Sequence, residues 1–207
     1  MIAIIDYKAG NLTSVKLAVQ KVGGNAVITS DPDVIRAADR IIFPGVGAAG
    51  AAMYNLRDLN LDTLVKEQIA SGKPFLGICV GLQVLFDMSE EDGGTDCLGI
   101  VPGQVKLFKA APPETKVPQM GWNSVNFVKS HPLLEGVKNN SYFYFVHSYY
   151  PYPSDKTYIL GETSYADVTF SSMIYKDNLV ATQFHLEKSG KVGLKILENF
   201  CGWDGTC

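Results

Sequence analysis

The sequence predicts an α/β fold with a central, mostly parallel sheet flanked by helices in its first half, and antiparallel strands in its second half. Short apolar runs alternate with amphipathic helical segments over residues 1–88. From residue 103 onward, strand-like runs follow one another with little helical signal until a last helix. The chain has 207 residues, 46% of them hydrophobic, and we expect one domain over residues 1–207.

The expected elements follow from apolar spacing and from residues that open or close helices. In the first half, strands are expected at residues 2–6, 26–29, 40–43 and 75–78, and helices at 11–22, from 31 onward, at 51–71 and at 80–88. In the second half, strands are expected at residues 103–108, 123–128, 142–150, 158–164, 170–175 and 179–184, the last two joined by a hairpin turn. A closing helix is expected at residues 191–200, and loops at 90–96 and 110–118.

Charge and cysteine usage argue against several classes of function. The net charge is only −3, and no run of Lys or Arg is long enough to follow a phosphate backbone, so we expect no nucleic-acid binding. No apolar stretch is long enough for a membrane span, and residues 1–6 lack the basic leader of a signal peptide. The four cysteines lack CxxC spacing, so we expect neither a disulfide framework nor a metal site. We expect a cytoplasmic protein without a cofactor.

The segment from Gly77 to Gln83 carries the strongest chemical signal. It places Cys79 where an apolar strand gives way to a helix, and we expect this turn to expose the sulfur. Gly77 and Gly81 flank the cysteine as glycines flank the serine of a nucleophile elbow. The helix N-terminus favours the thiolate, and the N–H of Val80 is a candidate oxyanion donor. Gln83 is expected on the same helix face, where it can bind substrate. A lone cysteine is more often structural, but the glycines favour a nucleophile.

A cysteine nucleophile needs a histidine that carries protons and a third group that orients the histidine. His131 precedes a proline in an expected loop and is expected to be solvated, and His147 follows an aromatic strand at a rim or a substrate cleft. His185 ends an expected strand, and in an extended chain the side chain of Glu187 points to the same side. We expect Glu187 to hold the His185 ring, although the pair alone also fits an ordinary strand end.

A glycine-rich loop at residues 44–47 directly follows the third expected strand. Loops that leave the carboxyl ends of parallel strands line the ligand crevice, and this loop leaves the strand beside the elbow. We expect the N–H of Val46 or Gly47 to be the second oxyanion donor. The spacing matches neither GxGxxG nor a P-loop, which disfavours phosphate binding, and a flexible turn is the plain alternative.

Together, residues 44–47, 77–83 and 184–189 resemble the class I glutamine amidotransferases in order and spacing along almost the whole chain. The resemblance implies a flavodoxin-like fold and a triad of Cys79, His185 and Glu187. It also implies a glutamine site that includes Gly47, Gln83, His147, Ser148 and Tyr149. Residues 6–12, 118–123 and 146–150 further resemble the glutaminase subunits of imidazole glycerol phosphate synthase.

This resemblance implies that glutamine is hydrolysed to glutamate and ammonia through a Cys79 thioester. The chain has room for one glutaminase domain, so we expect the ammonia acceptor on another polypeptide. The resemblance identifies it as a cyclase subunit in a heterodimer that makes imidazole glycerol phosphate and aminoimidazole carboxamide ribotide in histidine biosynthesis.

The interface candidates are Asn11, Trp122 and Lys188. Their equally weighted alternatives are a helix cap for Asn11, a core anchor for Trp122 and a solvated lysine for Lys188. Rival hypotheses are the glutaminase of a pyridoxal phosphate, purine or anthranilate synthase, and a non-enzymatic cysteine redox or stress sensor.

Overall fold

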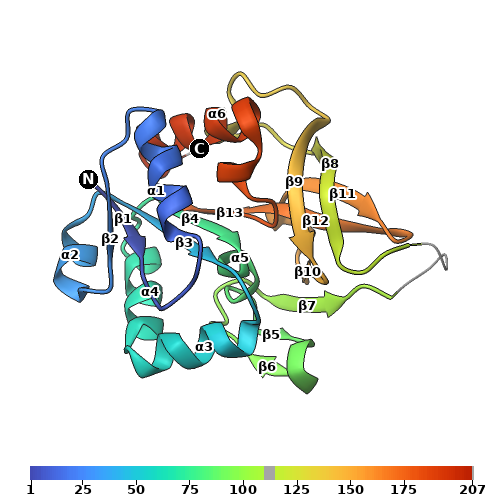
Figure 1. Cartoon of the computed structure of the whole chain (residues 1–207), viewed down its shortest axis with the longest axis horizontal. Helices are drawn as coiled ribbons and strands as arrows, with labels where there is room; N and C mark the ends of the chain where they lie inside the picture. The colour runs from blue at the N-terminus through green and yellow to red at the C-terminus, as the bar shows by residue number, and fades with distance from the viewer. Residues whose placement is uncertain (110–114, 207) are drawn as a thin grey trace.

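The computed structural model describes residues 1–109 and 115–206 and contains a nine-stranded and a four-stranded sheet (Figure 1). Its first elements are β1 (Ile2–Ile5), α1 (Leu12–Lys21), β2 (Ala26–Thr29), α2 (Pro32–Ala37), β3 (Arg40–Gly45), α3 (Ala49–Asp58), α4 (Leu61–Ala70), β4 (Phe75–Cys79) and α5 (Val80–Gln83). The next are β5 (Met88–Ser89), η1 (Glu91–Gly93), β6 (Thr95–Asp96), β7 (Gly103–Leu107), β8 (Gln119–Phe127), η2 (Pro132–Leu134) and β9 (Ser141–His147). The last are β10 (Tyr149–Pro153), η3 (Lys156–Tyr158), β11 (Ile159–Tyr165), β12 (Val168–Lys176), β13 (Leu179–Thr182), η4 (Leu186–Lys188) and α6 (Gly190–Gly202).

The larger sheet has the strand order β2-β1-β3-β4-β13-β12-β11-β8-β9. Its first five strands are parallel, and β13, β12, β11, β8 and β9 pair antiparallel with one another. Every residue of β1 and of β4 is buried, as in parallel strands that are covered on both faces. The predicted fold class, parallel in the first half and antiparallel in the second, is confirmed.

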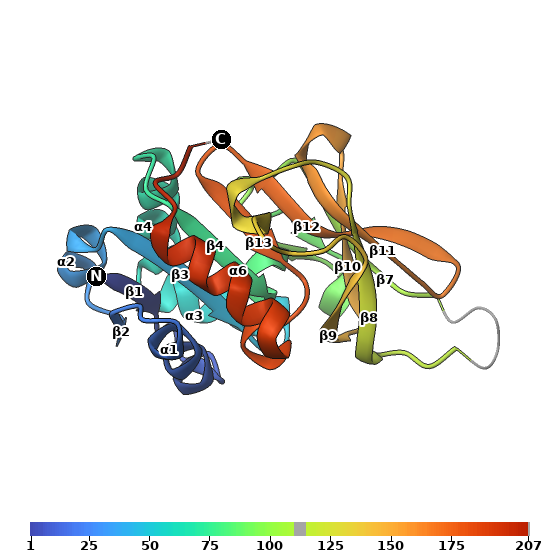
Figure 2. The same cartoon turned by 90° about the horizontal axis from the view of Figure 1, so that it is seen from above.

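Helices cover both faces of the parallel part of this sheet. Figures 1 and 2 show α1 and α6 side by side on one face, and α3 and α4 together on the other. Their inward side chains, such as Leu56, Leu64 and Ile196, are buried in the common core. Since β1, β3 and β4 run in the same direction, the segments that follow them meet at one edge of the sheet. Cys79 ends β4 at this edge.

The smaller sheet, in the order β10-β7-β5-β6, packs beside this edge. The single strand expected at residues 142–150 is two strands, because the chain leaves the larger sheet after β9 and enters the smaller sheet as β10. Ser148 lies at the crossing, where its carbonyl oxygen accepts a hydrogen bond of 3.0 Å from the N–H of Phe108. The crossing therefore joins the two sheets next to the end of β4.

Four other expected elements differ from the observed ones. The helix expected at residues 80–88 is the short α5, because the carbonyls of Val84, Leu85 and Phe86 accept N–H groups of residues 98–101 and are not used for a further helical turn. The strand expected at 179–184 ends at Thr182, and β8 begins four residues before the expected 123. The loop expected at 90–96 contains η1 and β6, and that expected at 110–118 lies partly outside the described residues.

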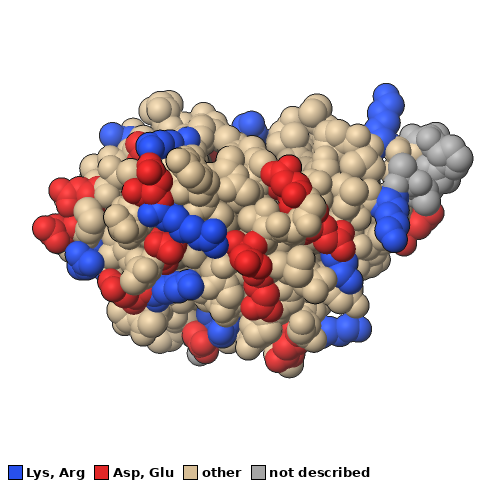
Figure 3. Space-filling model, turned by 90° about the horizontal axis from the view of Figure 1, so that it is seen from below, with Lys and Arg blue, Asp and Glu red and all other residues tan. Residues whose placement is uncertain are grey.

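The surface carries charges of both signs. On the face drawn in Figure 3, acidic and basic side chains are interspersed. Among the described residues, no helix has the length and apolar character that a membrane span requires. Nor do these residues contain a group of three or more His, Cys, Asp or Glu side chains that could hold a metal ion.

Candidate active site

Cys79 lies at a sharp turn between β4 and α5. Its backbone has φ 56° and ψ −113°, a strained conformation for a residue with a side chain. The following turn passes so close to β3 that a Cβ on Gly81 would lie 1.9 Å from the carbonyl oxygen of Phe43. On the other side, a Cβ on Gly77 would lie 2.9 Å from the Cβ of Ala181. The two glycines are therefore required by close packing, as the elbow interpretation predicts.

The sulfur faces a pocket and is not on the open surface. Cys79 is only 3% exposed, so the expectation of an exposed thiol is wrong. The pocket has a volume of about 310 Å³, which falls in the range of small-molecule sites. Its lining comprises Val46, Gly47, Cys79, Val80, Gln83, Glu91, Pro118, Val146, His147, Ser148, Tyr149 and His185.

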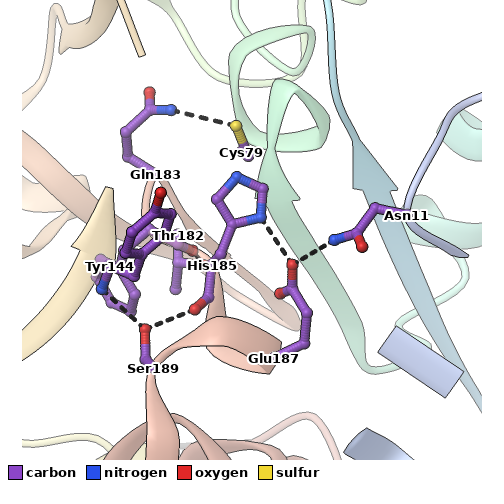
Figure 4. Close-up of polar contacts among 9 residues, drawn as sticks. Asn11, Cys79, Tyr144, Thr182, Gln183, His185, Glu187 and Ser189 are labelled. Atoms are coloured by element: carbon purple, nitrogen blue, oxygen red, sulfur yellow. Dashed lines mark hydrogen bonds and ion pairs between the residues drawn. The ribbon is translucent and has the colours of Figure 1, made fainter. Parts of the chain in front are cut away.

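His185 lies between Cys79 and Glu187 (Figure 4). Its Nδ1 is 2.8 Å from Glu187 Oε1, and both side chains are buried. The opposite ring nitrogen, Nε2, has no hydrogen-bond partner. Burial lowers the pKa of His185, but the interactions with Cys79 and Glu187 outweigh burial and raise this pKa to about 10. The ring is thus held as an imidazolium beside the sulfur.

The backbone around His185 is not the extended strand that the sequence suggests. After Thr182 the chain leaves the sheet, and residues 186–188 form the 3₁₀ turn η4, which brings the Glu187 carboxylate back to the ring. Ser189 fixes this turn, because its Oγ donates to the His185 carbonyl at 2.5 Å and accepts the N–H of Tyr144 at 3.0 Å. His185 N–H also donates to the Tyr144 carbonyl.

Asn11 extends the same set of contacts. Its Nδ2 donates to Glu187 Oε1 at 2.6 Å, the same oxygen that faces His185. Asn11 precedes α1 in a left-handed conformation and makes no capping hydrogen bond with its side chain, so the helix-cap alternative is wrong. Four side chains from β4, η4 and the start of α1 thus form one row from Cys79 to Asn11 (Figure 4).

A cysteine, an imidazolium and a carboxylate in a pocket are the groups of a thiol-dependent acyl transfer site. The family model for glutamine amidotransferase class-I matches residues 3–202. The chain belongs to the class I glutamine amidotransferases. Among the relatives, "Imidazole glycerol phosphate synthase subunit HisH" of Nitrosococcus oceani is 50% identical over 207 residues, covering 99% of this amidotransferase and 98% of the relative. The HisH subunit of Methanocaldococcus jannaschii is 54% identical over 200 residues, covering 97% and 98%.

Solved structures share the fold of this amidotransferase at low sequence identity. A glutamine amidotransferase superposes with a TM-score of 0.75 at 14% identity, covering 98% of this chain and all of the other. The structure of PurLQS from Thermotoga maritima contains a chain that gives a TM-score of 0.72 at 14% identity, covering 97% of each chain. These likenesses show the fold of the class.

The other residues that the sequence selects for the amidotransferase site also line the pocket, with one change of role. Val46, Gly47, Val80, Gln83, Ser148 and Tyr149 surround the sulfur. The His147 ring is not free for a ligand, because Nδ1 lies 2.7 Å from the Tyr149 carbonyl oxygen and Nε2 lies 3.0 Å from Gln119 Oε1. Burial lowers the pKa of His147 to about 4, and the two contacts hold the ring in place at the wall of the pocket.

Sequence reasoning missed two polar residues of the amidotransferase site. Glu91 lines the pocket, and its Oε2 accepts the N–H of Ala49 at the start of α3 at 2.6 Å. Gln183 is fully buried and contacts Cys79 Sγ. Glu91 follows another glutamate in an expected loop and Gln183 falls inside an expected strand, so neither had a distinguishing local pattern.

The expectation for His131 is corrected as well. It is buried, its Nδ1 accepts the N–H of Leu133, and its ring packs edge-on against Tyr175 and Trp203. The role is structural, as expected, but the side chain is not solvated.

Trp122 and Lys188 lie at the surface of the amidotransferase. Trp122 is 55% exposed on β8, so the core-anchor alternative is wrong. Its ring meets the Tyr144 ring edge-on, and Lys188 Nζ lies 5.8 Å from the centroid of the same ring. Exposed Met120 and Tyr142 extend this patch along β8 and β9. The patch adjoins η4, which carries Glu187.

Proposed function

We propose that this chain is the glutaminase subunit of imidazole glycerol phosphate synthase, which hydrolyses glutamine to glutamate and ammonia with Cys79, His185 and Glu187 as its catalytic triad. The observation that carries the proposal is the position of the His185 ring, between the pocket sulfur and a buried carboxylate. The HisH relatives, about half identical over nearly the whole chain, support the same conclusion.

In the first step, the Cys79 thiolate attacks the side-chain amide carbon of glutamine. The protonated His185, which Glu187 orients, then gives its proton to the departing nitrogen, and the C–N bond breaks. Ammonia leaves, and the glutamyl group stays on the sulfur as a thioester. The unpartnered Nε2 of His185 is the ring atom available for this transfer, because Nδ1 is occupied by Glu187.

In this proposal, backbone N–H groups stabilise the oxyanion and pocket side chains bind glutamine. Val80 begins α5, where the N–H groups lack helical acceptors, and with the N–H of Val46 it stabilises the oxyanion. Glu91 is the one carboxylate among the described residues that line the pocket beside the triad, and it suits the α-ammonium of glutamine. Gly47, Gln83 and Tyr149 complete the binding site.

Ammonia is passed to a cyclase subunit, and the two chains form a heterodimer in the cytoplasm. An exposed apolar patch of Met120, Trp122 and Tyr142 supports a protein partner, since large apolar side chains gathered at a surface mark binding faces. Lys188, adjacent to Glu187, and Asn11, bonded to it, connect that face with the site.

The test is release of glutamate from glutamine, measured with and without the cyclase subunit. We expect release that depends on Cys79 and vanishes in Cys79→Ala, while Cys97→Ser retains it, because Cys97 lies outside the pocket lining. Absence of glutamate under both conditions would contradict the glutaminase assignment.

A second measurement addresses the partner. The cyclase subunit with its phosphoribosyl-formimino substrate should form imidazole glycerol phosphate from glutamine only when this chain is added. Trp122→Ala should weaken binding of the cyclase by about tenfold or more, since exposed tryptophans are frequent anchors of interfaces. Equal affinity of Trp122→Ala and wild type would show that the partner binds elsewhere.

A further inference from the structure

Gln183 contacts the reactive sulfur from behind the pocket. It follows β13, is fully buried, and donates from Nε2 to Cys79 Sγ at 3.7 Å (Figure 4). Its Oε1 accepts a hydrogen bond of 2.9 Å from Gln83 Nε2. The backbone N–H of Gln183 donates to the Ser172 carbonyl, which ties the residue to β12. A buried amide in direct contact with a nucleophile has a chemical consequence, because its two ends act oppositely on a negative charge.

A backbone carbonyl fixes which end of Gln183 faces the sulfur. Gln83 Nε2 donates to the Tyr149 carbonyl oxygen at 3.0 Å, and a carbonyl can only accept, so the amide nitrogen of Gln83 must lie there. The second N–H of that nitrogen points to Gln183, which therefore presents its oxygen. The NH₂ group of Gln183 is left for Cys79. Its orientation thus follows from the hydrogen-bond chain itself.

We propose that Gln183 is a catalytic residue that donates a hydrogen bond to Cys79 Sγ whenever the sulfur carries negative charge. This inference rests on the proposed glutaminase function. An amide N–H stabilises a thiolate without protonating it, so the nucleophile stays ready for attack while His185 holds the proton. In the thioester the sulfur is uncharged, and the hydrogen bond is weaker.

The largest effect is expected on hydrolysis of the thioester. The oxygen of water bonds to the glutamyl carbonyl carbon, and His185 accepts a proton from that water. The C–S bond then breaks, its electron pair returns to Sγ, and glutamate leaves. Because negative charge develops on the sulfur in this step, the Gln183 N–H stabilises the transition state more than it stabilises the thioester.

Two substitutions separate the donor from the rest of the side chain. Gln183→Glu keeps an acceptor for Gln83 but places a carboxylate oxygen against the sulfur, and Gln183→Met removes both polar atoms at similar volume. Gln68→Glu is the matched control, since Gln68 is another buried amide, on α4, whose Oε1 accepts from Lys73 Nζ. Thermal melting identifies variants that remain folded.

The first readout needs no glutaminase activity. Iodoacetamide labelling of the peptide that contains Cys79, followed by mass spectrometry from pH 5 to 10, gives the pH at half-maximal labelling. We expect this pH to rise by about one unit in both Gln183 variants, a tenfold change in ionisation, and to be unchanged in Gln68→Glu. The proposal would be overturned if both Gln183 variants are folded and reach half-maximal labelling at the same pH as wild type.

The second readout is the glutamyl thioester itself. After acid quenching during turnover, intact-protein mass spectrometry should show more glutamyl adduct in both Gln183 variants than in wild type, because hydrolysis is slowed by about tenfold. Slower turnover with no additional adduct would contradict a role in thioester hydrolysis. If wild type releases no glutamate, the proposed function fails, and the labelling profile still decides whether Gln183 stabilises the thiolate.

Discussion

Asn11 Nδ2 donates a hydrogen bond of 2.6 Å to Glu187 Oε1, across 176 positions of sequence. The same oxygen lies 2.8 Å from His185 Nδ1, so the Asn11 amide and the imidazolium converge on one atom. Since a carboxylate that holds a histidine must itself be held, Asn11 restricts the direction in which Glu187 can present this oxygen. The residue that precedes α1 thereby supports the pair of His185 and Glu187 near the other end of the chain.

Asn11→Ala should lower glutaminase turnover by about tenfold, because a hydrogen bond to a charged group contributes about 1.5–3 kcal/mol. Asn60→Ala is the matched control. Both asparagines precede a helix in a left-handed conformation, and neither caps that helix with its side chain. Each substitution should therefore cost about 1 kcal/mol in unfolding free energy from backbone strain. Equal turnover of the two variants would argue against support of Glu187 by Asn11.

The pKa of His185 predicts the alkaline limit of the reaction. Interactions with Cys79 and Glu187 overcome the effect of burial and raise this pKa to about 10, so the protonated ring persists well above neutral pH. Turnover should decline as pH approaches 10, and the decline should begin at lower pH in Glu187→Gln, which removes the negative partner. A pH profile of glutamate release measures both. If the alkaline decline of Glu187→Gln begins at the same pH as that of wild type, deprotonation of His185 is not its cause.

The same pKa bears on folding. His185 binds its proton more tightly in the folded chain than the ordinary value of 6.5 implies. Its contribution to the unfolding free energy is therefore present in full below pH 6.5 and is lost as pH rises through about 10. Urea unfolding between pH 6.5 and 10 should show a shallower fall in stability for His185→Gln than for wild type. Parallel curves would contradict this linkage.

His131 has the opposite dependence on pH. Burial lowers its pKa from 6.5 to about 4, so the unfolded chain binds a proton that the folded chain resists. The contribution of His131 to the unfolding free energy is therefore present above pH 6.5 and is lost as pH falls toward 4. His131→Asn retains an acceptor for the Leu133 N–H and should flatten part of the loss of unfolding free energy between pH 7 and 4. The remaining loss includes that from His147, which has the same pKa direction.

Gly81→Ala should destabilise the chain by about 3 kcal/mol or more, because the new Cβ would lie 1.9 Å from the Phe43 carbonyl oxygen. The atoms nearest to this Cβ belong to the backbone of Phe43 and Pro44, which leaves little room for adjustment. Gly202, at the end of α6, has no atom within 4 Å of such a Cβ, so Gly202→Ala should be nearly neutral. Urea denaturation of the two variants tests the difference. Similar midpoints would show that the elbow is more adaptable than its packing implies.

Local patterns in the sequence are sufficient for most of the longer strands, for most helices and for the Cys79 elbow. Apolar runs indicate buried segments, and Gly77 and Gly81 indicate a turn with no room for larger side chains. The end of α5 was not predictable, since it depends on carbonyls that bond to residues 98–101. Likewise, the division of the strand expected at 142–150 into β9 and β10 arises because β9 joins the larger sheet and β10 joins the smaller one.

The candidate site shows the same division. His185 and Glu187 were recognisable as a pair, but the expected extended geometry was wrong, because the 3₁₀ turn that joins them is held by contacts of Ser189 with Tyr144. The contacts of Asn11 with Glu187 and of Gln183 with Cys79 join residues more than one hundred positions apart. Side-chain pairings of this kind arise only when the sheet has assembled.

The left-handed backbone of Cys79 places reactivity and folding stability in opposition at a single position. With φ 56° and ψ −113°, the cysteine occupies a conformation that glycine adopts with far less strain. Cys79→Gly should therefore melt at a higher temperature than Cys79→Ala, although both lack the sulfur. The proposed nucleophile thus lies where an inert glycine would give a more stable protein, and selection for thermostable variants would favour loss of the sulfur.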